Sequence, residues 1–355
     1  MNNLTKILAA MAAQGLDAVL LTSEVNRQYA AGYNVAEGVA IISAAGARYM
    51  TDSRYIEAAE ANLDGFEVKM VGSGVTYYAL LQAALADFGV KRLGYEESVM
   101  TVAELKGYQS ALQAEWFEAQ GLFGQLRATK APEELAIMRR AQEVTDAAFA
   151  EMLTVLRPGM SEKEVMAELI YRLLKHGGEK LSFDPIVVSG PNSSMPHGVP
   201  GERKLQNGDF VTMDFGVKVG GYCSDMTRTV ALGHATDEMK HVYETVLAAQ
   251  LAGIAATRAG VPGCEIDGAA RRVIADAGYG ACFGHGYGHS LGLEIHEAPN
   301  CNMSNKKPMP AFAVSSAEPG IYLPGKFGVR IEDVVIIQDN GCEDITKSPK
   351  QLIIL

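Results

Sequence analysis

Residues 209–230 read DFVTMDFGVKVGGYCSDMTRTV, and this stretch decides the fold of the second half of the chain. Its first six residues alternate, so Asp214 shares one face of a predicted strand with every second residue. The glycines that follow predict a turn, and the returning strand carries Asp225. A turn symmetric about residues 219 and 220 would put the two aspartates opposite each other. A two-residue Gly220-Gly221 loop would put them diagonally across the hairpin.

In either arrangement the two aspartates lie within roughly 4.5–8 Å of each other, and like charges that close destabilise a sheet unless a cation lies between them. Three further candidate ligands follow: His289 in GHGYGHSLGLEIHE, Glu318 in SAEPGIY and Glu332 in GVRIED. Carboxylates with one imidazole suit manganese, cobalt, iron or zinc. Two such ions about 3.5–4 Å apart are the machinery of aminopeptidases. We therefore expect two divalent cations, held by Asp214, Asp225, His289, Glu318 and Glu332.

Other residues near these positions are candidates for contact with substrate. His296 lies seven residues after His289, in a stretch from Gly292 that reads as a strand, and His197 lies in a Pro/Gly loop, where functional side chains are often displayed. Arg330 and Glu332 would share a face of a continuous strand, so the guanidinium could hold a carboxylate near the metals or a substrate carbonyl. Explaining the carboxylates as buried ion pairs instead would need five partners that the sequence does not show nearby.

Composition excludes several classes of protein. A length of 355 residues predicts two domains, and a net charge of −11 argues against nucleic-acid binding. The five cysteines are scattered without a C-x-x-C pair, so they form neither a disulfide framework nor a zinc ribbon; Cys223 would share a strand face with Asp225. The N-terminal stretch predicts an amphipathic helix through Leu4, Ile7 and Met11 rather than a signal peptide. No stretch reaches the about 18 apolar residues of a membrane span, and we expect a cytoplasmic protein.

The chain predicts a domain boundary near residue 125. Residues 1–125 alternate helix-like and strand-like runs, which predicts a small α/β domain. Gly121 to Thr129 reads as a junction, with Thr129 as the cap of a long helix that has Pro132 in its first turn. Ser161 and Glu164 predict a capping box before the next helix. From residue 181 strands and glycine-rich turns dominate, apart from helical stretches at 239–258 and 265–277, so the chemistry belongs to a domain spanning 126–355.

The motifs MDFG, GGYCSDMTRT, GHSLGLEIHE, EPGIY and GVRIED together resemble the pita-bread metallopeptidase family. Within that family they are similar to the proline-specific branch of aminopeptidase P and prolidase, over nearly the whole chain. The resemblance implies an α+β fold: a small creatinase-like α/β domain followed by a pita-bread catalytic domain. It also disfavours the simple methionine aminopeptidases, which lack the N-terminal domain.

The resemblance implies a role for each candidate residue. Asp214 resembles a bidentate ligand of one ion, and Asp225 and Glu332 resemble the bridging carboxylates. His289 and Glu318 resemble the ligands of the other ion, with Glu318 also the general base. A final set resembles the histidines that steer the substrate and stabilise the tetrahedral intermediate, and the supporting residues beside them: His197, His296, Tyr322 and Arg330.

The expected activity is hydrolysis of the peptide bond before proline at peptide N-termini, with manganese as the first choice of metal. One departure from the family pattern concerns the length of the peptide substrate. After Glu297-Ala-Pro299 many prolidase-like members carry an arginine that grips a dipeptide's carboxylate, whereas this chain has Asn300-Cys-Asn-Met303. Lys306 and Lys307 would substitute if their loop folded inward. The missing arginine favours an aminopeptidase on longer peptides over a prolidase.

Two rival interpretations within the family are a non-catalytic binding module and a metal-free creatinase-like hydrolase. Both lack the full ligand set, which this chain retains. Relatives commonly dimerise, so we expect a homodimer that acts on proline-containing peptides.

Overall fold

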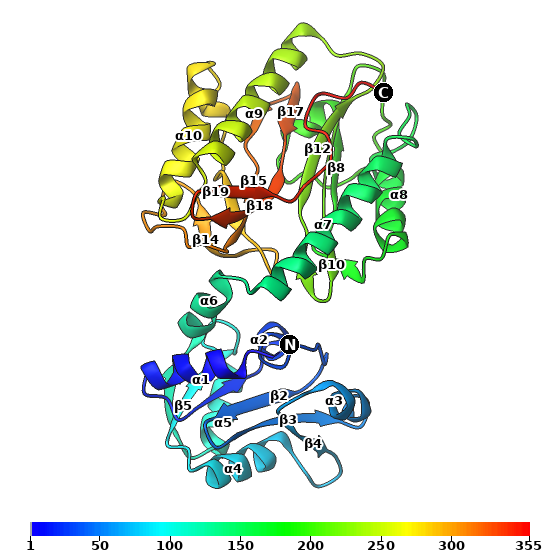
Figure 1. Ribbon diagram of the computed structural model, residues 1–355. Helices are drawn as coiled ribbons and strands as arrows, with labels where there is room; N and C mark the ends of the chain where they lie inside the picture. Colours follow the sequence, from blue (N-terminus) through cyan, green and yellow to red (C-terminus); the bar gives the residue numbers. More distant parts are fainter. Residues whose placement is uncertain (1) are drawn as a thin grey trace. The chain divides into compact units, whose positions relative to one another are not determined.

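The computed structural model describes residues 2–355, and only the backbone of Gln120. The chain forms two compact units that adjoin in sequence between Arg127 and Ala128 (Figure 1). The first unit contains one six-stranded sheet and the second contains four smaller sheets between pairs of helices.

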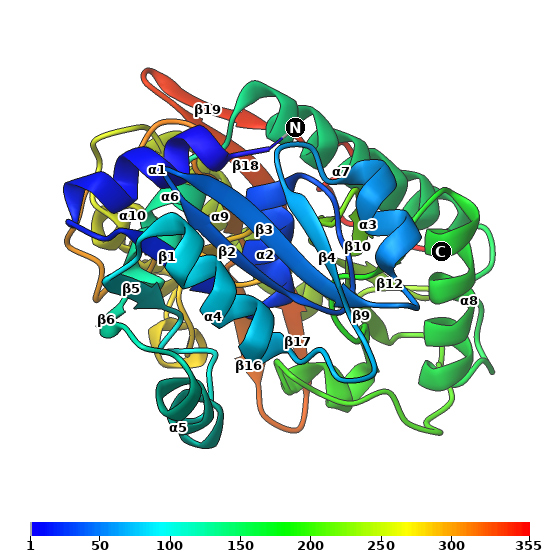
Figure 2. The same cartoon turned by 90° about the horizontal axis from the view of Figure 1, so that it is seen from below.

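In the first unit, the sheet has the order β4-β3-β2-β1-β5-β6. Its strands are β1 (Ala18–Leu21), β2 (Val39–Ser43), β3 (Gly46–Asp52), β4 (Glu67–Val71), β5 (Arg92–Tyr95) and β6 (Glu115–Glu118). Its helices are α1 (Leu4–Ala13), α2 (Glu24–Ala31), α3 (Ile56–Asn62), α4 (Tyr77–Phe88), α5 (Val102–Ala111) and α6 (Gln120–Ala128). Strand β1 is buried along its whole length and pairs antiparallel with β2 and parallel with β5 (Figure 2). The amphipathic N-terminal helix is confirmed, because Ile7 and Met11 of α1 are buried.

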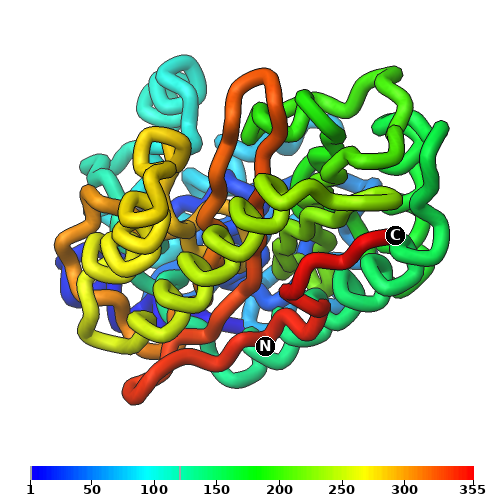
Figure 3. The backbone as a smooth tube through the Cα atoms, turned by 90° about the horizontal axis from the view of Figure 1, so that it is seen from above, coloured from blue at the N-terminus to red at the C-terminus, as the bar shows by residue number. Residues whose placement is uncertain are grey.

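The second unit carries its helices in two pairs, α7 (Pro132–Met152) with α8 (Glu162–Lys175), and α9 (Asp237–Ala256) with α10 (Gly263–Asp276). Figure 3 shows α9 and α10 running side by side. The strands of the first two sheets are β7 (Lys180–Leu181), β8 (Ile186–Ser189), β9 (Phe210–Phe215), β10 (Val217–Val219), β11 (Tyr222–Cys223) and β12 (Met226–Ala231). The later strands are β13 (Gly288–Ser290), β14 (Glu297–Cys301), β15 (Val314–Ala317), β16 (Gly320–Leu323), β17 (Phe327–Arg330), β18 (Asp333–Gln338) and β19 (Gly341–Asp344).

Each helix pair covers its own apolar core. Val211 and Met213 of β9 pack with residues of α7 and α8, whereas Phe210 of the same strand packs with residues of α9 and α10. This is the alternation expected from the sequence, since neighbouring residues of a strand point to opposite faces. The sheet that contains β9 therefore lies between the two helix pairs, and Asp214 shares the face of Phe210.

The hairpin that decides the fold closes with the two-residue loop. Val219 pairs with Tyr222, which leaves Gly220-Gly221 as the turn, and both glycines have positive φ, 54° and 82°. Two positive φ angles in succession are what a tight hairpin turn requires, and glycine adopts them without a steric penalty. As a consequence Asp214 pairs with Thr227, so the diagonal of the two arrangements is the observed one.

Several predicted helix boundaries need correction. The capping box of Ser161 and Glu164 is confirmed at the start of α8. The residues read as a junction form helix α6 instead, because Leu122 and Phe123 are buried on one side of it. Thr129 does not cap α7: that helix begins at Pro132 after Ala131, whose N–H is bound by the Glu134 carboxylate at 2.8 Å.

Two predicted strand segments are also wrong. Residues 292–296 form bends, and β14 begins only at Glu297. The strand that carries Arg330 ends there, so it does not continue through Glu332. The reason lies in the partners: β17 pairs with β16, whereas β18 pairs with β15 in a different sheet, so the chain must change direction between them.

Candidate metal centre

All five candidate ligands line one cavity of about 460 Å³ in the second unit. They come from five places in the chain. Asp214 lies in β9, Asp225 between β11 and β12, His289 in β13, Glu318 between β15 and β16, and Glu332 between β17 and β18. Because β9 and β13 belong to different sheets, the cavity lies where those sheets approach each other.

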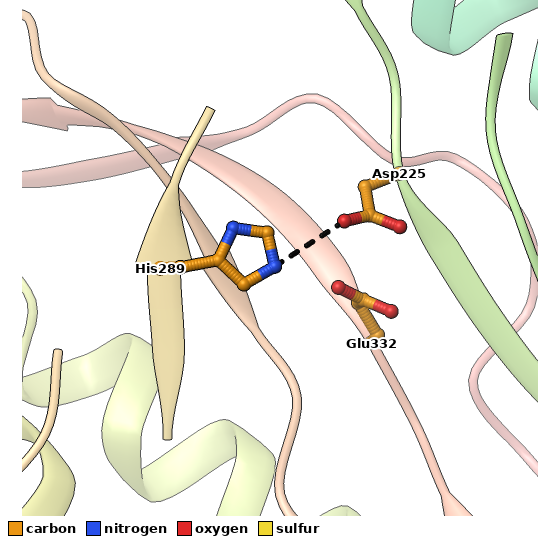
Figure 4. A group of neighbouring side chains, drawn as sticks. All are labelled: Asp225, His289 and Glu332. Carbon is orange, nitrogen blue, oxygen red and sulfur yellow. Dashed lines mark ion pairs between the residues drawn. The ribbon is translucent and has the colours of Figure 1, made fainter. Parts of the chain in front are cut away.

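The tightest part of this group is Asp225, His289 and Glu332, whose potential ligand atoms lie within 4.8 Å of one another. Figure 4 shows the imidazole and the two carboxylates pointing toward a common centre. The Nε2 atom of His289 is 3.5 Å from Asp225 Oδ2 and 3.3 Å from Glu318 Oε1. Four carboxylates and one ring nitrogen therefore converge, which is the donor set of a hard divalent cation.

The buried oxygens of this group test whether a cation fits. Asp214 Oδ1, Asp225 Oδ1 and Glu332 Oε1 are buried and have no hydrogen-bond partner among residues 2–355. A buried carboxylate oxygen without a partner is costly, and coordination to a cation removes that cost. The residues present therefore fit divalent metal ions.

Electrostatics lead to the same conclusion. Burial, reinforced by the charges of Glu332 and Asp214, holds the pKa of Asp225 well above its usual value. Burial, with the charges of Glu318 and Asp214, does the same to the pKa of Glu332. Four carboxylates this close and this buried resist being charged together unless positive charge is supplied.

The surroundings of His289 favour its neutral form, which is the form that binds a metal ion. Burial lowers the pKa of its imidazole. Its Nδ1 lies 3.2 Å from the carbonyl oxygen of Ser290, so a proton on Nδ1 leaves the lone pair of Nε2 facing the carboxylates. Ser316 links the backbone of His289 to the next candidate ligand, because its hydroxyl accepts from the backbone N–H of His289 at 3.0 Å and donates to Glu318 Oε1 at 3.1 Å.

The Arg330 side chain contacts one candidate ligand directly and a second one through Thr227. Its Nη2 lies 2.5 Å from Asp214 Oδ2, and its Nε donates to the Thr227 hydroxyl at 3.0 Å. That hydroxyl donates in turn to Glu332 Oε2 at 2.6 Å. The hydroxyl of Tyr322 accepts from Arg330 Nη1 at 2.8 Å. Arg330 thus holds a carboxylate near the site, as expected, although it does not share a continuous strand with Glu332.

The predicted substrate-facing histidines lie on the same cavity. His197 and His296 both line it, and the His296 ring stacks edge-on against His289 with the ring centroids 4.4 Å apart. Tyr322 is not among the lining residues and contacts the site through Arg330.

One histidine of the cavity wall was not singled out from the sequence. His285 lines the cavity, its Nε2 lies 2.9 Å from the Tyr322 hydroxyl, and burial lowers the pKa of its ring. The signal was present in the sequence, since His285 lies four residues before His289 in the same glycine-rich run.

Other candidates lie away from the cavity. Cys223 is buried with its Sγ 3.8 Å from the Leu293 carbonyl oxygen, and it does not line the cavity. Asn300 and Asn302 do line it. Lys306 and Lys307 are exposed and do not, so within the described chain they do not take the place of the missing arginine.

Comparisons with known proteins agree with this site. Residues 136–339 match the model of Metallopeptidase family M24, and residues 3–129 match the Creatinase/Prolidase N-terminal domain. The chain belongs to metallopeptidase family M24. This metallopeptidase thus has the expected α+β architecture, a creatinase-type N-terminal domain before a pita-bread domain, and its family implies divalent metal ions.

Relatives of this metallopeptidase match it from end to end. An uncharacterized peptidase of Bacillus subtilis, YqhT, is 41% identical over 96% of both chains. A solved Xaa-Pro dipeptidase from Bacillus anthracis is 41% identical, with a TM-score of 0.95 over 99% of both chains. The X-Pro aminopeptidase from Thermotoga maritima is 34% identical, with a TM-score of 0.94 over 100% of both chains. The protein is therefore a peptidase, and the rival interpretation as a non-catalytic binding module is excluded.

Among helices of the described chain, none combines the length and apolar character that crossing a membrane requires.

Proposed function

We propose that this metallopeptidase hydrolyses the peptide bond before proline at the N-terminus of peptides. The observation that carries the proposal is one cavity on which the four candidate carboxylate ligands, His289 and three further histidines converge. The solved relatives that match the whole chain are named as Xaa-Pro peptidases, which supports proline as the residue after the cleaved bond.

We assign the metal ligands as Asp214, Asp225, His289, Glu318 and Glu332, and manganese as the metal. When bound, two divalent ions supply a nucleophilic hydroxide near neutral pH and polarise the substrate carbonyl. The four carboxylates and the Nε2 of His289 would hold these ions in the cavity.

The protein's own groups perform the proton transfers. Glu318 accepts the proton of the attacking water and then donates it to the proline nitrogen, a tertiary amide nitrogen that leaves poorly without protonation. His197 and His296, on the same cavity wall, donate hydrogen bonds to the carbonyl oxygen as it gains negative charge. Arg330 keeps Asp214 oriented through its 2.5 Å contact.

Peptide length is the point on which two candidate activities differ. Asn300 and Asn302 line the cavity, and Arg330 is engaged by Asp214 and Tyr322, so the described cavity wall offers no uncommitted arginine or lysine for a dipeptide's carboxylate. This favours an aminopeptidase on longer peptides. The Xaa-Pro dipeptidase names of relatives from Bacillus anthracis and Pyrococcus horikoshii favour a prolidase. We place the aminopeptidase first and infer a homodimer, which light scattering would measure.

Hydrolysis of three peptides by the Mn²⁺-loaded protein tests the proposal: Gly-Pro-Gly-Gly, Gly-Pro and Gly-Gly-Gly-Gly. Release of glycine from the first peptide alone is the expected result. Cleavage of Gly-Pro alone would make the protein a prolidase. Cleavage of tetraglycine at the same rate as Gly-Pro-Gly-Gly would contradict the proline specificity.

A further inference from the structure

One carboxylate on the cavity wall has no task in the proposed chemistry. Five carboxylates line the cavity in the described chain, and four of them are the candidate metal ligands. The fifth, Asp184, is exposed and makes no hydrogen bond or ion pair with residues 2–355. Each of the others has a partner: Arg330 for Asp214, His289 for Asp225 and Glu318, and the Thr227 hydroxyl for Glu332. Asp184 is therefore the carboxylate of the described cavity wall that is available to bind a positively charged group of the substrate.

The position of Asp184 follows from the strand that it precedes. Ile186 of β8 pairs with Asp214 of β9, and Asp184 lies two residues earlier. Asp184 and Ile186 both line the cavity, while Pro185 between them is buried and does not, so residues 184–186 alternate as a strand does. Two extended residues span about 6.7 Å, and paired antiparallel Cα atoms lie about 5 Å apart. The Cα atoms of Asp184 and Asp214 are therefore about 8 Å apart.

This separation selects which cation of a substrate reaches Asp184. The scissile carbonyl must lie at the ligand cluster. The α-amino group of the first residue is two bonds from that carbonyl carbon, so it stays beside the four carboxylates of the ligand cluster. A lysine side chain, with five bonds of about 1.5 Å, extends about 6 Å from its Cα and does reach. The residue after the bond is proline, which carries no charge, and any later side chain begins about 7 Å further away.

We propose that Asp184 binds the cationic side chain of the residue before proline, so that peptides beginning Lys-Pro or Arg-Pro are preferred substrates. The inference rests on the proposed Xaa-Pro activity. Phe183 and Ile186, which line the cavity on either side of Asp184, offer apolar surface to the methylene stem of such a side chain, while the charged end stays near water.

The test compares two substrates that differ only in one charge: Lys-Pro-Gly-Gly and the same peptide with an acetylated lysine side chain. The ratio of their kcat/KM values is measured for the wild type and for Asp184→Asn. In the wild type the charged peptide is favoured about fivefold at low salt, the upper range for an exposed ion pair, and less so at high salt. In Asp184→Asn the ratio falls to about one. Using a ratio removes differences in the amount of folded enzyme.

Two controls locate the effect. Asp339→Asn removes one exposed negative charge in the turn between β18 and β19, away from the cavity, and should leave the ratio as in the wild type. Asp184→Lys should reverse the preference and favour Glu-Pro-Gly-Gly. A ratio near one in the wild type, or the same ratio in wild type and Asp184→Asn, would overturn the inference.

Two further peptides separate the possible failures. Leu-Pro-Gly-Gly reports the proposed function alone: if it is cleaved while the lysine ratio is one, only the role of Asp184 is lost. If no Xaa-Pro peptide is cleaved, the proposed function falls and this inference falls with it. A preference for Leu-Pro-Lys over its acetylated form that disappears in Asp184→Asn would place the cation after proline and overturn the assignment.

Discussion

The Thr227 hydroxyl helps to hold two of the candidate metal ligands in position. Its hydroxyl donates to Glu332 and accepts from Arg330, and Arg330 in turn contacts Asp214. One hydroxyl therefore links Glu332 directly, and Asp214 through Arg330, although the two residues lie far apart in the sequence. Groups that hold metal ligands in this way typically change metal affinity 10–100-fold when they are removed.

Thr227→Val should weaken Mn²⁺ binding to metal-free protein by at least about tenfold, because valine keeps the volume but leaves Glu332 Oε2 and Arg330 Nε without this partner. Titration calorimetry measures the affinity. Thr227→Ser retains the hydroxyl and serves as the matched control, with binding close to that of the wild type. Weaker binding in Thr227→Ser together with unchanged binding in Thr227→Val would show that the methyl group matters rather than the hydrogen bonds.

The five candidate ligands could be proposed from the sequence because each lies in a distinctive motif, and all five line one cavity, but the contacts between them could not be predicted. Nothing in the sequence indicates that Arg330 reaches Asp214, 116 residues earlier, since that depends on how β9 and β17 pack. His285 was missed for a related reason: its partner Tyr322 lies 37 residues away in the chain.

At the scale of elements, local signals predicted most of the helices and strands. The Ser161–Glu164 box and the alternation in β9 identified their elements correctly because both are short-range patterns. The bends at 292–296 and helix α6 were misread because long-range contacts decide them. Residues 292–296 include Gly292, whose carbonyl oxygen accepts from the Cys223 N–H at 2.7 Å, and α6 is fixed by the burial of Leu122 and Phe123.

The cap of α8 predicts a pH dependence. The backbone N–H of Ser161, and then Lys204, lower the pKa of Glu164 to about 2. A folded-state pKa below the unfolded one means that the cap stabilises the helix fully above about pH 4.5, and the contribution is lost as pH falls toward 2. Hydrogen-exchange protection factors in the first turn of α8 should therefore drop between pH 5 and pH 3. In Glu164→Gln that pH dependence should be absent; its persistence would contradict the assignment.

In the catalytic unit as a whole, a buried ion pair connects segments that lie far apart in the sequence. Arg228 of β12 is 1% exposed and its Nη2 lies 2.7 Å from Asp333 Oδ1, while its Nη1 donates to the Glu332 carbonyl oxygen at 2.6 Å. Arg228 also donates to the carbonyl oxygens of Ser348 and Pro349 near the C-terminus. The C-terminal segment is thereby fastened to the strands that carry the ligands.

Arg228→Met should lower the free energy of unfolding by about 3–5 kcal/mol, because it leaves a buried carboxylate with one cation fewer. Urea unfolding followed by circular dichroism measures this. Arg139→Met, which breaks a half-exposed pair with Glu343, is the matched control and should cost about 1 kcal/mol or less.

Burial alone would raise the pKa of Asp333, but Arg228 and Lys350 lower it overall. The stabilisation is therefore present above about pH 4 and lost below it, and the gap between variant and wild type should shrink in acid.

The measurement that tests the account most directly is the number of Mn²⁺ ions bound per chain, by calorimetric titration of metal-free protein. The account predicts two ions for the wild type. It predicts a lost or greatly weakened second ion in Asp225→Asn, since Asp225 is assigned as a bridge. Binding of no ion by the wild type, or identical titrations for wild type and Asp225→Asn, would contradict the assignment of this cavity as a two-metal centre.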